Sequence, residues 1–195
     1  SPASRAGVFE VCVVGHLREV KNVSRLLGAL ARVLLRHDNV HLLLLGDGPQ
    51  RQMLEERAAE SPLGGHVHFA GHQSPLGPWY RSMDAFAISS DSEQMPIALI
   101  EEMASGLPVA STDVGDVRLV LPEPQHTLLV PVRGGTTAER LAIALGRLAT
   151  DTELRRTLGA ANRERVAEHY TLEGMVSAHR AQWDGALARG LPASV

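Results

Sequence analysis

The sequence has one cysteine, one lysine and no long apolar run, and each shortage excludes a class of protein. Cys12 is the only cysteine in 195 residues, which excludes a disulfide scaffold, a cysteine zinc site and CxxC redox chemistry. The longest uncharged apolar run, residues 40–45 and interrupted by His41, is far too short for a membrane-spanning helix. A net charge of −3 argues against a general nucleic-acid binder, so we expect no nucleic-acid partner.

Lysine is scarce because arginine replaces it: Lys21 is the one lysine among 19 basic residues. This bias, together with frequent Ala, Leu and Gly, indicates a GC-rich bacterial genome. The first residues show no basic flank followed by an apolar segment, so we expect a cytoplasmic protein. We predict one domain over residues 8–190, preceded by a disordered lead-in or tag remnant over residues 1–7.

Short apolar runs alternate with stretches of helical periodicity, and the last third of the chain is helical throughout. The apolar runs predict strands at residues 8–14, 40–45, 67–70, 85–88, 109–111 and 128–130. The periodic stretches predict helices at residues 22–36, 49–60, 75–83, 96–105, 138–149, 152–170 and 172–188, with a helical turn after Gly115. Asp151 is the expected N-cap of the helix over residues 152–170.

Strands separated by helices are typical of βαβ units, which require a parallel sheet with helices on both faces. We therefore predict an α/β fold, a Rossmann-like doubly wound parallel sheet of about six strands with a C-terminal helical extension. Ligands of such sheets bind beyond the carboxyl ends of the strands. The candidate site therefore lies in the loops that follow the strands, at residues 15–22, 46–49, 71–74, 89–95 and 112–116.

The first of these loops carries cations at a place suited to an anion. It contains Gly15, His16, Arg18 and Lys21, and a helix follows it. Free backbone amides and the positive end of the helix dipole at such a junction favour phosphate, so a diphosphate would fit here. Neither a Walker motif nor GxGxxG is present, and ordinary solvated surface cations are the alternative.

Residues 82–117 contain seven carboxylates and no Lys, Arg or His. Glu93 lies in the loop before a helix that we expect to begin at Pro96 with Met95 as its N-cap, and Glu101 lies about a turn and a half into that helix. Carboxylates without cationic partners suit sugar hydroxyls. The phosphate would then sit at Lys21, and the ligand would be gripped at opposite ends. Exposed helix surface and a metal site are the alternatives for this carboxylate pair.

Several blocks now carry a resemblance to a known family. They are VCVVGHLREVKNVSRLLGAL, LLLLGDGPQRQMLEE, VHFAGH, YRSMDAFAISSDSEQMPIALIEEMASGLPVASTDVGD, TLLVPV and LRRTLGAANRERVAEHYTLEGM. In this order they resemble the C-terminal, donor-binding domain of retaining GT-B glycosyltransferases of the group 1 or family 4 type. The resemblance runs from about Val8 to Trp183. Its most specific part is Glu93 and Glu101, separated by seven residues, within the block that also holds Pro96 and Gly106.

The resemblance implies roles for individual residues. It places the donor sugar at Glu93 and the ribose at Glu101. It places the remaining contacts in three loops: Lys21, Arg18, His16 and Gly15 for the diphosphate; Gln94, Met95, Pro96 and Ile97 for the sugar; and Gly71 and His72 for the base. It assigns no catalytic residue to this half of the enzyme, no metal and no cofactor, because the nucleoside-diphosphate sugar is a substrate.

The resemblance also implies an activity that this chain cannot complete alone. The full enzyme would transfer a hexose, with retention, to an acceptor bound by an N-terminal domain that this chain lacks, so we expect the fragment to be inactive by itself. Three departures from the family pattern keep other functions open: His16 replaces an arginine, Leu119 replaces an acid after the unusual pair Gly115 and Asp116, and Glu102 replaces a small residue. The alternatives are a degenerate nucleotide-sugar-binding or interaction module, and a GT-B epimerase or phosphorylase.

Other features have simpler interpretations. His66, His68 and His72 are expected to be surface histidines rather than zinc ligands, and Trp79 and Tyr80 to be core rather than stacking residues. The helix over residues 172–188 would pack against the missing domain and leave its apolar side exposed here. The resemblance leaves room for peripheral membrane association of the full enzyme, and the oligomeric state is open.

Overall fold

The computed structural model describes residues 7–132 and 135–188, and it forms one six-stranded, all-parallel sheet of strand order β3-β2-β1-β4-β5-β6. This is the doubly wound order expected of a Rossmann-like sheet, so the predicted fold class is confirmed. The strands are β1 (Phe9–Val14), β2 (Val40–Leu45), β3 (Val67–Gly71), β4 (Ala85–Ile88), β5 (Val109–Thr112) and β6 (Leu129–Val130). Residues 1–6 of the predicted lead-in and residues 189–190 of the predicted domain lie outside the described residues.

The predicted helices all form, with shifted ends. They are α1 (Val23–Leu34), α2 (Arg51–Ala58), α3 (Gly77–Tyr80), α4 (Ile97–Ala104), α5 (Val117–Val120), α6 (Thr137–Thr150), α7 (Thr152–His169) and α8 (Leu172–Ala188). The sequence pattern missed two 3₁₀ helices, η1 (Glu19–Lys21) and η2 (Glu123–Leu128), because such short turns carry too few residues to show a period.

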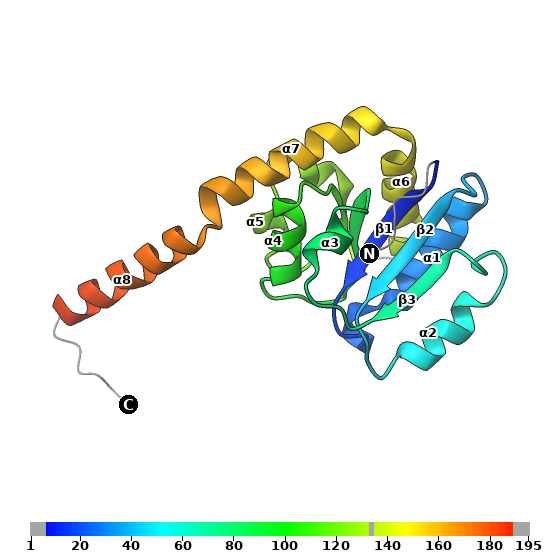
Figure 1. The fold of residues 1–195 in the computed structure, drawn as a ribbon, viewed down its shortest axis with the longest axis horizontal. Coiled ribbons are helices and arrows are strands. Elements are labelled where there is room, and N and C mark those ends of the chain that lie inside the picture. Colours follow the sequence, from blue (N-terminus) through cyan, green and yellow to red (C-terminus); the bar gives the residue numbers. More distant parts are fainter. Residues whose placement is uncertain (1–6, 133–134, 189–195) are drawn as a thin grey trace.

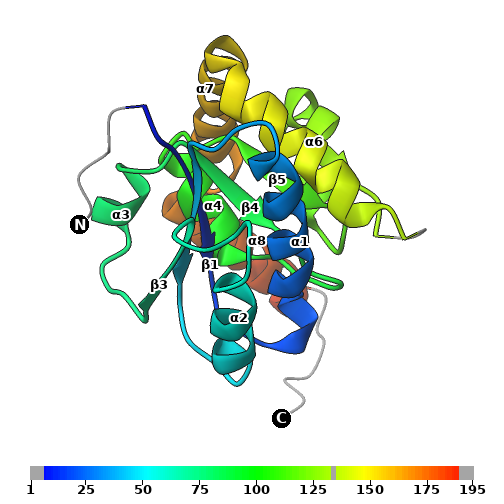
Figure 2. The same ribbon diagram turned by 90° about the vertical axis from the view of Figure 1, so that its right-hand side faces the viewer.

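Helices cover both faces of the sheet. On one face α1 and α6 pack together, and α1 buries apolar residues three and four positions apart, such as Val23, Leu26 and Leu30. On the other face the core includes residues of α3, α4 and α5. Figure 2 shows the sheet between these two layers, with α1 and α6 on one side and α3 and α4 on the other. The strand order reverses between β1 and β4, so their carboxyl ends border the crevice where such sheets bind ligands.

The last two helices follow the last strand; α7 packs against α4, and α8 extends beyond the domain (Figure 1). The Asp151 side chain caps α7 as predicted, because its Oδ1 accepts a hydrogen bond of 2.8 Å from the backbone amide of Leu154. Helix α8 projects away from the domain, and its apolar residues Leu172, Trp183 and Leu187 are exposed, as the sequence predicted. In the described part of the chain, no helix has the length and apolar character needed to cross a bilayer.

Candidate functional site

The loop after β1 is fixed against the loop after β2. Gly46 approaches Gly15 so closely that a Cβ on Gly46 would collide with the Gly15 carbonyl oxygen. The amide of Leu17 donates a hydrogen bond to the carbonyl oxygen of Asp47 (2.9 Å). The side chain of Lys21 lies over Gly15, where a Cβ would be 3.6 Å from its Cε and 3.9 Å from its Nζ. The glycine therefore brings the only lysine close to the backbone at the carboxyl end of β1.

Lys21 also contacts the first carboxylate of the predicted pair. Its Nζ lies 2.7 Å from Glu93 Oε1, and the hydroxyl of Ser90 donates a 2.5 Å hydrogen bond to the same oxygen. The Glu93 side chain is only 10% exposed and that of Lys21 is 31% exposed. The two residues therefore lie side by side as an ion pair, and the expectation that they bind the phosphate and the sugar of one ligand stays a prediction.

The acidic segment has cationic partners after all. Arg25 Nη2 pairs with Asp91 at 2.5 Å, and Arg118 Nη2 pairs with Asp113 at 2.5 Å. The expectation of unpartnered carboxylates fails because the partners of Asp91 and Glu93 come from the β1–α1 segment, which is distant in sequence. Charges that the sequence separates are brought together by the order of the strands.

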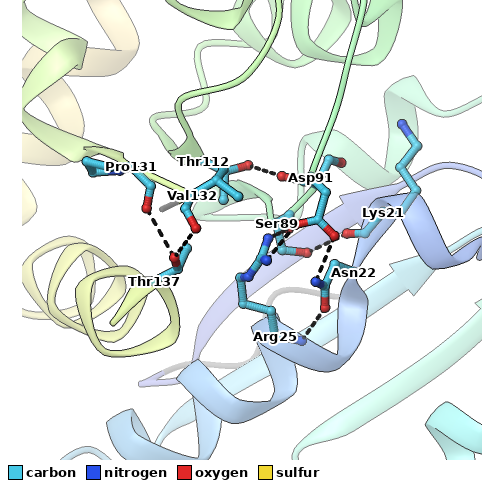
Figure 3. A network of polar contacts seen from close by, with 10 residues as sticks. Lys21, Asn22, Arg25, Ser89, Asp91, Thr112, Pro131, Val132 and Thr137 are labelled. Atoms are coloured by element: carbon cyan, nitrogen blue, oxygen red, sulfur yellow. Dashed lines mark hydrogen bonds and ion pairs between the residues drawn. The ribbon is translucent and has the colours of Figure 1, made fainter. Parts of the chain in front are cut away.

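A polar network joins the loops after β1 and β4 (Figure 3). Arg25 donates through Nη1 to the Ser89 carbonyl oxygen (2.7 Å), and Asn22 donates through Nδ2 to Asp91 Oδ2 (3.0 Å). Ser89 in turn donates its hydroxyl to the Lys21 carbonyl oxygen (2.9 Å). Burial raises the pKa of Asp91, but the hydrogen bonds from Arg25 and Asn22 outweigh this effect and hold it below its usual value. The network fixes the backbone of Lys21 against the loop of Glu93.

Sequence reasoning did not assign a role to Asn22, Arg25, Ser89 or Asp91. One signal was available, because Asn is a favoured N-cap before a periodic helix. Asn22 caps α1 with φ of 42°, and its Oδ1 accepts a hydrogen bond from the Arg25 amide at 3.2 Å. The contacts of Arg25 and Asp91 depend on which loops meet in space, and the sequence carries no direct sign of that.

Helix α4 begins one residue later than predicted. Its N-cap is Pro96 in an extended conformation, not Met95, and the first helical residue is Ile97. Proline offers no side-chain acceptor, and within the described residues no side chain caps this helix, so its first amides stay available to a ligand. Met95 and Ile97 are exposed. Gly115, at φ of 53°, packs against the Glu93 carbonyl oxygen so tightly that any side chain would collide with it.

Glu101 lies on α4 beside Tyr80. The Tyr80 hydroxyl donates a 3.1 Å hydrogen bond to Glu101 Oε2, while the tyrosine itself is 4% exposed, which confirms it as a core residue. Trp79 is partly buried and packs against the same core. Burial and the nearby carboxylates of Glu102 and Glu101 raise the pKa of Tyr80, so the hydroxyl remains a donor.

Glu102, which follows Glu101 on α4, is fully buried. Neither carboxylate oxygen has a hydrogen-bond partner among the described residues. Burial, followed by the charge of Glu101, raises its pKa well above the ordinary value, which favours the protonated form of this side chain. Burial and the charge of Glu102 likewise raise the pKa of the Cys12 thiol.

Two cavities flank the Lys21 loop. One, of about 300 Å³, is lined by residues that follow β1, β2 and β3: Val14, Gly15, His16, Leu45, Gly46, Asp47, His72, Gln73 and Leu76. It brings together three residues predicted for the diphosphate and the base. Gly71 lies beside this cavity, since its carbonyl oxygen accepts a hydrogen bond from the amide of Gly46 (2.8 Å). Arg18 lines a second cavity of about 270 Å³ with Asn22 and Asp91.

His41 of β2 and His68 of β3 lie side by side, and His66 lies just before β3. His41 Nδ1 lies 3.1 Å from His68 Nε2, and His66 Nδ1 lies 3.1 Å from the Val40 carbonyl oxygen. His72 lies apart from them, in the 300 Å³ cavity. The part of the chain that the structure describes contains no group of three His, Cys, Asp or Glu residues placed to hold a metal ion.

Comparison with known proteins gives a family match and many relatives. Residues 9–151 match the family described as Glycosyl transferases group 1. A lipopolysaccharide core biosynthesis glycosyltransferase, LpsE of Rhizobium meliloti, is 30% identical over 87% of this chain and 48% of its own length. The chain spans about half the length of the curated relatives that it matches first.

Solved structures share the fold. The C-terminal domain of a group 1 glycosyl transferase, LpcC of Francisella tularensis, has a TM-score of 0.74 at 20% identity, and the match covers 84% of this chain and 87% of that one. The pneumococcal O-GlcNAc transferase GtfA, in complex with UDP and GlcNAc, has a TM-score of 0.81 at 20% identity, over 95% of this chain and 37% of that one.

Proposed function

The chain belongs to the group 1 glycosyl transferases, and from this membership we propose that it is the donor-binding half of a retaining GT-B glycosyltransferase. The donor would be a nucleoside-diphosphate sugar, and a hexose would pass to an acceptor bound by an N-terminal domain. The observation that carries the proposal is the position of Lys21. The only lysine lies over Gly15 and beside Glu93, at the edge of the sheet where doubly wound folds bind ligands.

Each part of the donor has a candidate partner. Lys21, Gly15 and His16 would bind the diphosphate, with Arg18 at the rim, and the cavity that contains His72 has room for the base beside Gly71. Glu93 would accept hydrogen bonds from sugar hydroxyls, and the open start of α4 at Gln94, Met95, Pro96 and Ile97 would contact sugar and phosphate. Glu101, held by Tyr80, would accept the ribose hydroxyls. The complex of GtfA with UDP and GlcNAc supports this class of donor.

The chemistry asked of this half is electrostatic. When the bond from the sugar to the diphosphate breaks, negative charge grows on the leaving phosphate, and Lys21 together with the α4 amides would stabilise it. Holding the donor next to the acceptor would also accelerate the transfer, because the two reactants no longer have to meet by diffusion. We assign no nucleophile to Glu93 or Glu101, because both are proposed to bind the donor, and we expect this half to be inactive alone.

Titration calorimetry with UDP, GDP and ADP tests the proposal. We expect one of the three to bind. Lys21→Ala should lower the affinity for that nucleotide far more than the affinity for its parent nucleoside, because only the nucleotide carries phosphate. Arg140→Ala, an exposed cation on α6, is the control and should change neither affinity. Glu101→Gln should lower the affinity for the nucleotide roughly 10- to 150-fold, since a charge-assisted hydrogen bond to the ribose is lost.

The replacements His16 and Leu119 favour a second candidate, a degenerate module that no longer turns over a donor. Histidine offers one neutral hydrogen bond where arginine offers a charged fork. No heat with any nucleotide at millimolar concentration would support that candidate. Equal loss of nucleotide and nucleoside affinity in Lys21→Ala would show instead that Lys21 does not contact the phosphate. An epimerase would bind the same nucleotide sugar, so activity of the full-length enzyme has to separate it from a transferase, whereas a phosphorylase would act with phosphate and without a nucleotide.

A further inference from the structure

The ion pair between Lys21 and Glu93 gives the site a competitor for the donor's phosphate. Glu93 Oε1 lies 2.7 Å from Lys21 Nζ, and it is almost enclosed, with 10% of the side chain exposed. We propose that Glu93 competes with the diphosphate for Lys21, so that the site selects diphosphates that carry a sugar over those that do not. This inference rests on the proposed function and adds a selectivity to it.

The competition follows from the charges at the pair. A lysine ammonium has three donors but one positive charge, and the negative charge of Glu93 already faces it. A free nucleoside diphosphate would bring further negative charge to the same ammonium and would be repelled by the carboxylate. Weakening the ion pair between Lys21 and Glu93 would offset part of the favourable binding free energy of the free diphosphate.

A sugar attached to the diphosphate changes this balance. Its hydroxyls would donate hydrogen bonds to Glu93 and satisfy the carboxylate as Lys21 turns toward phosphate. Ser90 already donates one hydrogen bond of 2.5 Å to Glu93 Oε1, so the carboxylate would stay hydrogen-bonded during the exchange. The sugar therefore offsets the cost that the bare diphosphate has to meet alone.

Backbone and side-chain hydrogen bonds fix the loop of Lys21 against the loop of Glu93. The Asp91 amide donates to the Val20 carbonyl oxygen (2.8 Å), the Ser89 hydroxyl donates to the Lys21 carbonyl oxygen (2.9 Å), and Arg25 joins both sides (Figure 3). In Figure 3 the Lys21 side chain points away from the Arg25–Asp91 pair, so that pair does not take up its ammonium. The two loops are thus fixed together, while the tips of Lys21 and Glu93 can exchange partners.

Glu93→Gln tests the proposal, because it removes the competing charge and keeps the shape. With whichever of UDP, GDP or ADP binds the wild-type chain, we expect the variant to bind the free nucleoside diphosphate about three- to tenfold more tightly. The preference for the matching glucose conjugate over the free diphosphate should fall by at least as much. Glu164→Gln, an exposed carboxylate on α7, is the control and should change neither affinity.

The outcomes separate this inference from the function beneath it. Unchanged or weaker binding of the free diphosphate to Glu93→Gln, with normal binding to the wild-type chain, would overturn the inference alone. If the role of Glu93 is purely structural, Glu93→Gln would lower the affinities for the free diphosphate and for the sugar conjugate together, and this result would also contradict the proposed competition. No binding of any nucleotide to the wild-type chain would overturn both the inference and the proposed function.

Discussion

At the scale of single residues, Glu102 stands out because a buried carboxyl without a partner is costly. Taking a polar group from water without replacing its hydrogen bonds destabilises a fold by about 1–3 kcal/mol in mutational series. Glu102 has neither exposure nor a partner among the described residues, and it lies next to a residue proposed to bind ribose. The resemblance marks this position as one where a small residue is usual.

We predict that stability depends on the charge state of Glu102. Its pKa is raised in the fold, so the unfolded chain loses the proton first, and unfolding becomes easier as pH rises above the ordinary value of 4.5. For each pH unit between the two pKa values, Glu102→Gln should gain about 1.4 kcal/mol over the wild type. Urea unfolding from pH 4 to pH 8 measures this difference. A constant difference across that range would contradict a raised pKa.

At the scale of elements, the clamp between Arg25 and Asp91 holds the loops of Lys21 and Glu93 together. We predict a coupling of about 0.5–1 kcal/mol in a double-mutant cycle of Arg25→Leu and Asp91→Asn, since solvent partly screens the pair. The pKa of Asp91 is lowered in the fold, so the coupling exists above the pKa of an unfolded aspartate and is lost as pH falls through the folded value.

The exposed pair of Arg156 and Glu153 on α7 provides the matched control for this cycle. Both side chains are about 70% exposed, so no measurable coupling is expected there. Urea unfolding measures both cycles. Equal couplings in the two pairs would show that the clamp is no more than a surface contact.

The contact of α7 with α4 depends on a glycine. A Cβ on Gly159 would collide with the Gly106 carbonyl oxygen just after α4. We predict that Gly159→Ala destabilises the fold by about 1–3 kcal/mol, although alanine is the better helix former. Gly146→Ala on α6 is the control, since a Cβ there meets no atom within 4 Å, and it should gain about 0.5–1 kcal/mol in thermal or urea unfolding. Similar effects at both positions would contradict the packing argument.

At the scale of the whole molecule, the sequence predicts the architecture better than the site. Apolar runs and helical periods depend on neighbours along the chain, so the strands, the helices and the sheet class follow from them. The pairing of Lys21 with Glu93 depends on loops that are 72 residues apart, and no local pattern reports it. The sequence marks Glu102 as unusual, but the burial of its side chain depends on how α4 packs onto the sheet.

Helix α8 carries large apolar residues that the described domain leaves exposed. These residues, Leu172, Trp183 and Leu187, form the surface that the proposed N-terminal domain would cover. The central claim does not depend on that domain, because the proposed donor site uses residues of this chain.

The single lysine allows this claim to be tested by one NMR signal. In protein labelled with ¹³C at the lysine Cε, Lys21 gives the only labelled resonance. The account predicts that this resonance shifts when the nucleoside diphosphate that binds is titrated in, and that it does not shift with the parent nucleoside. A lysine resonance that stays in place while calorimetry shows the nucleoside diphosphate bound would contradict the claim that Lys21 binds the donor's phosphate.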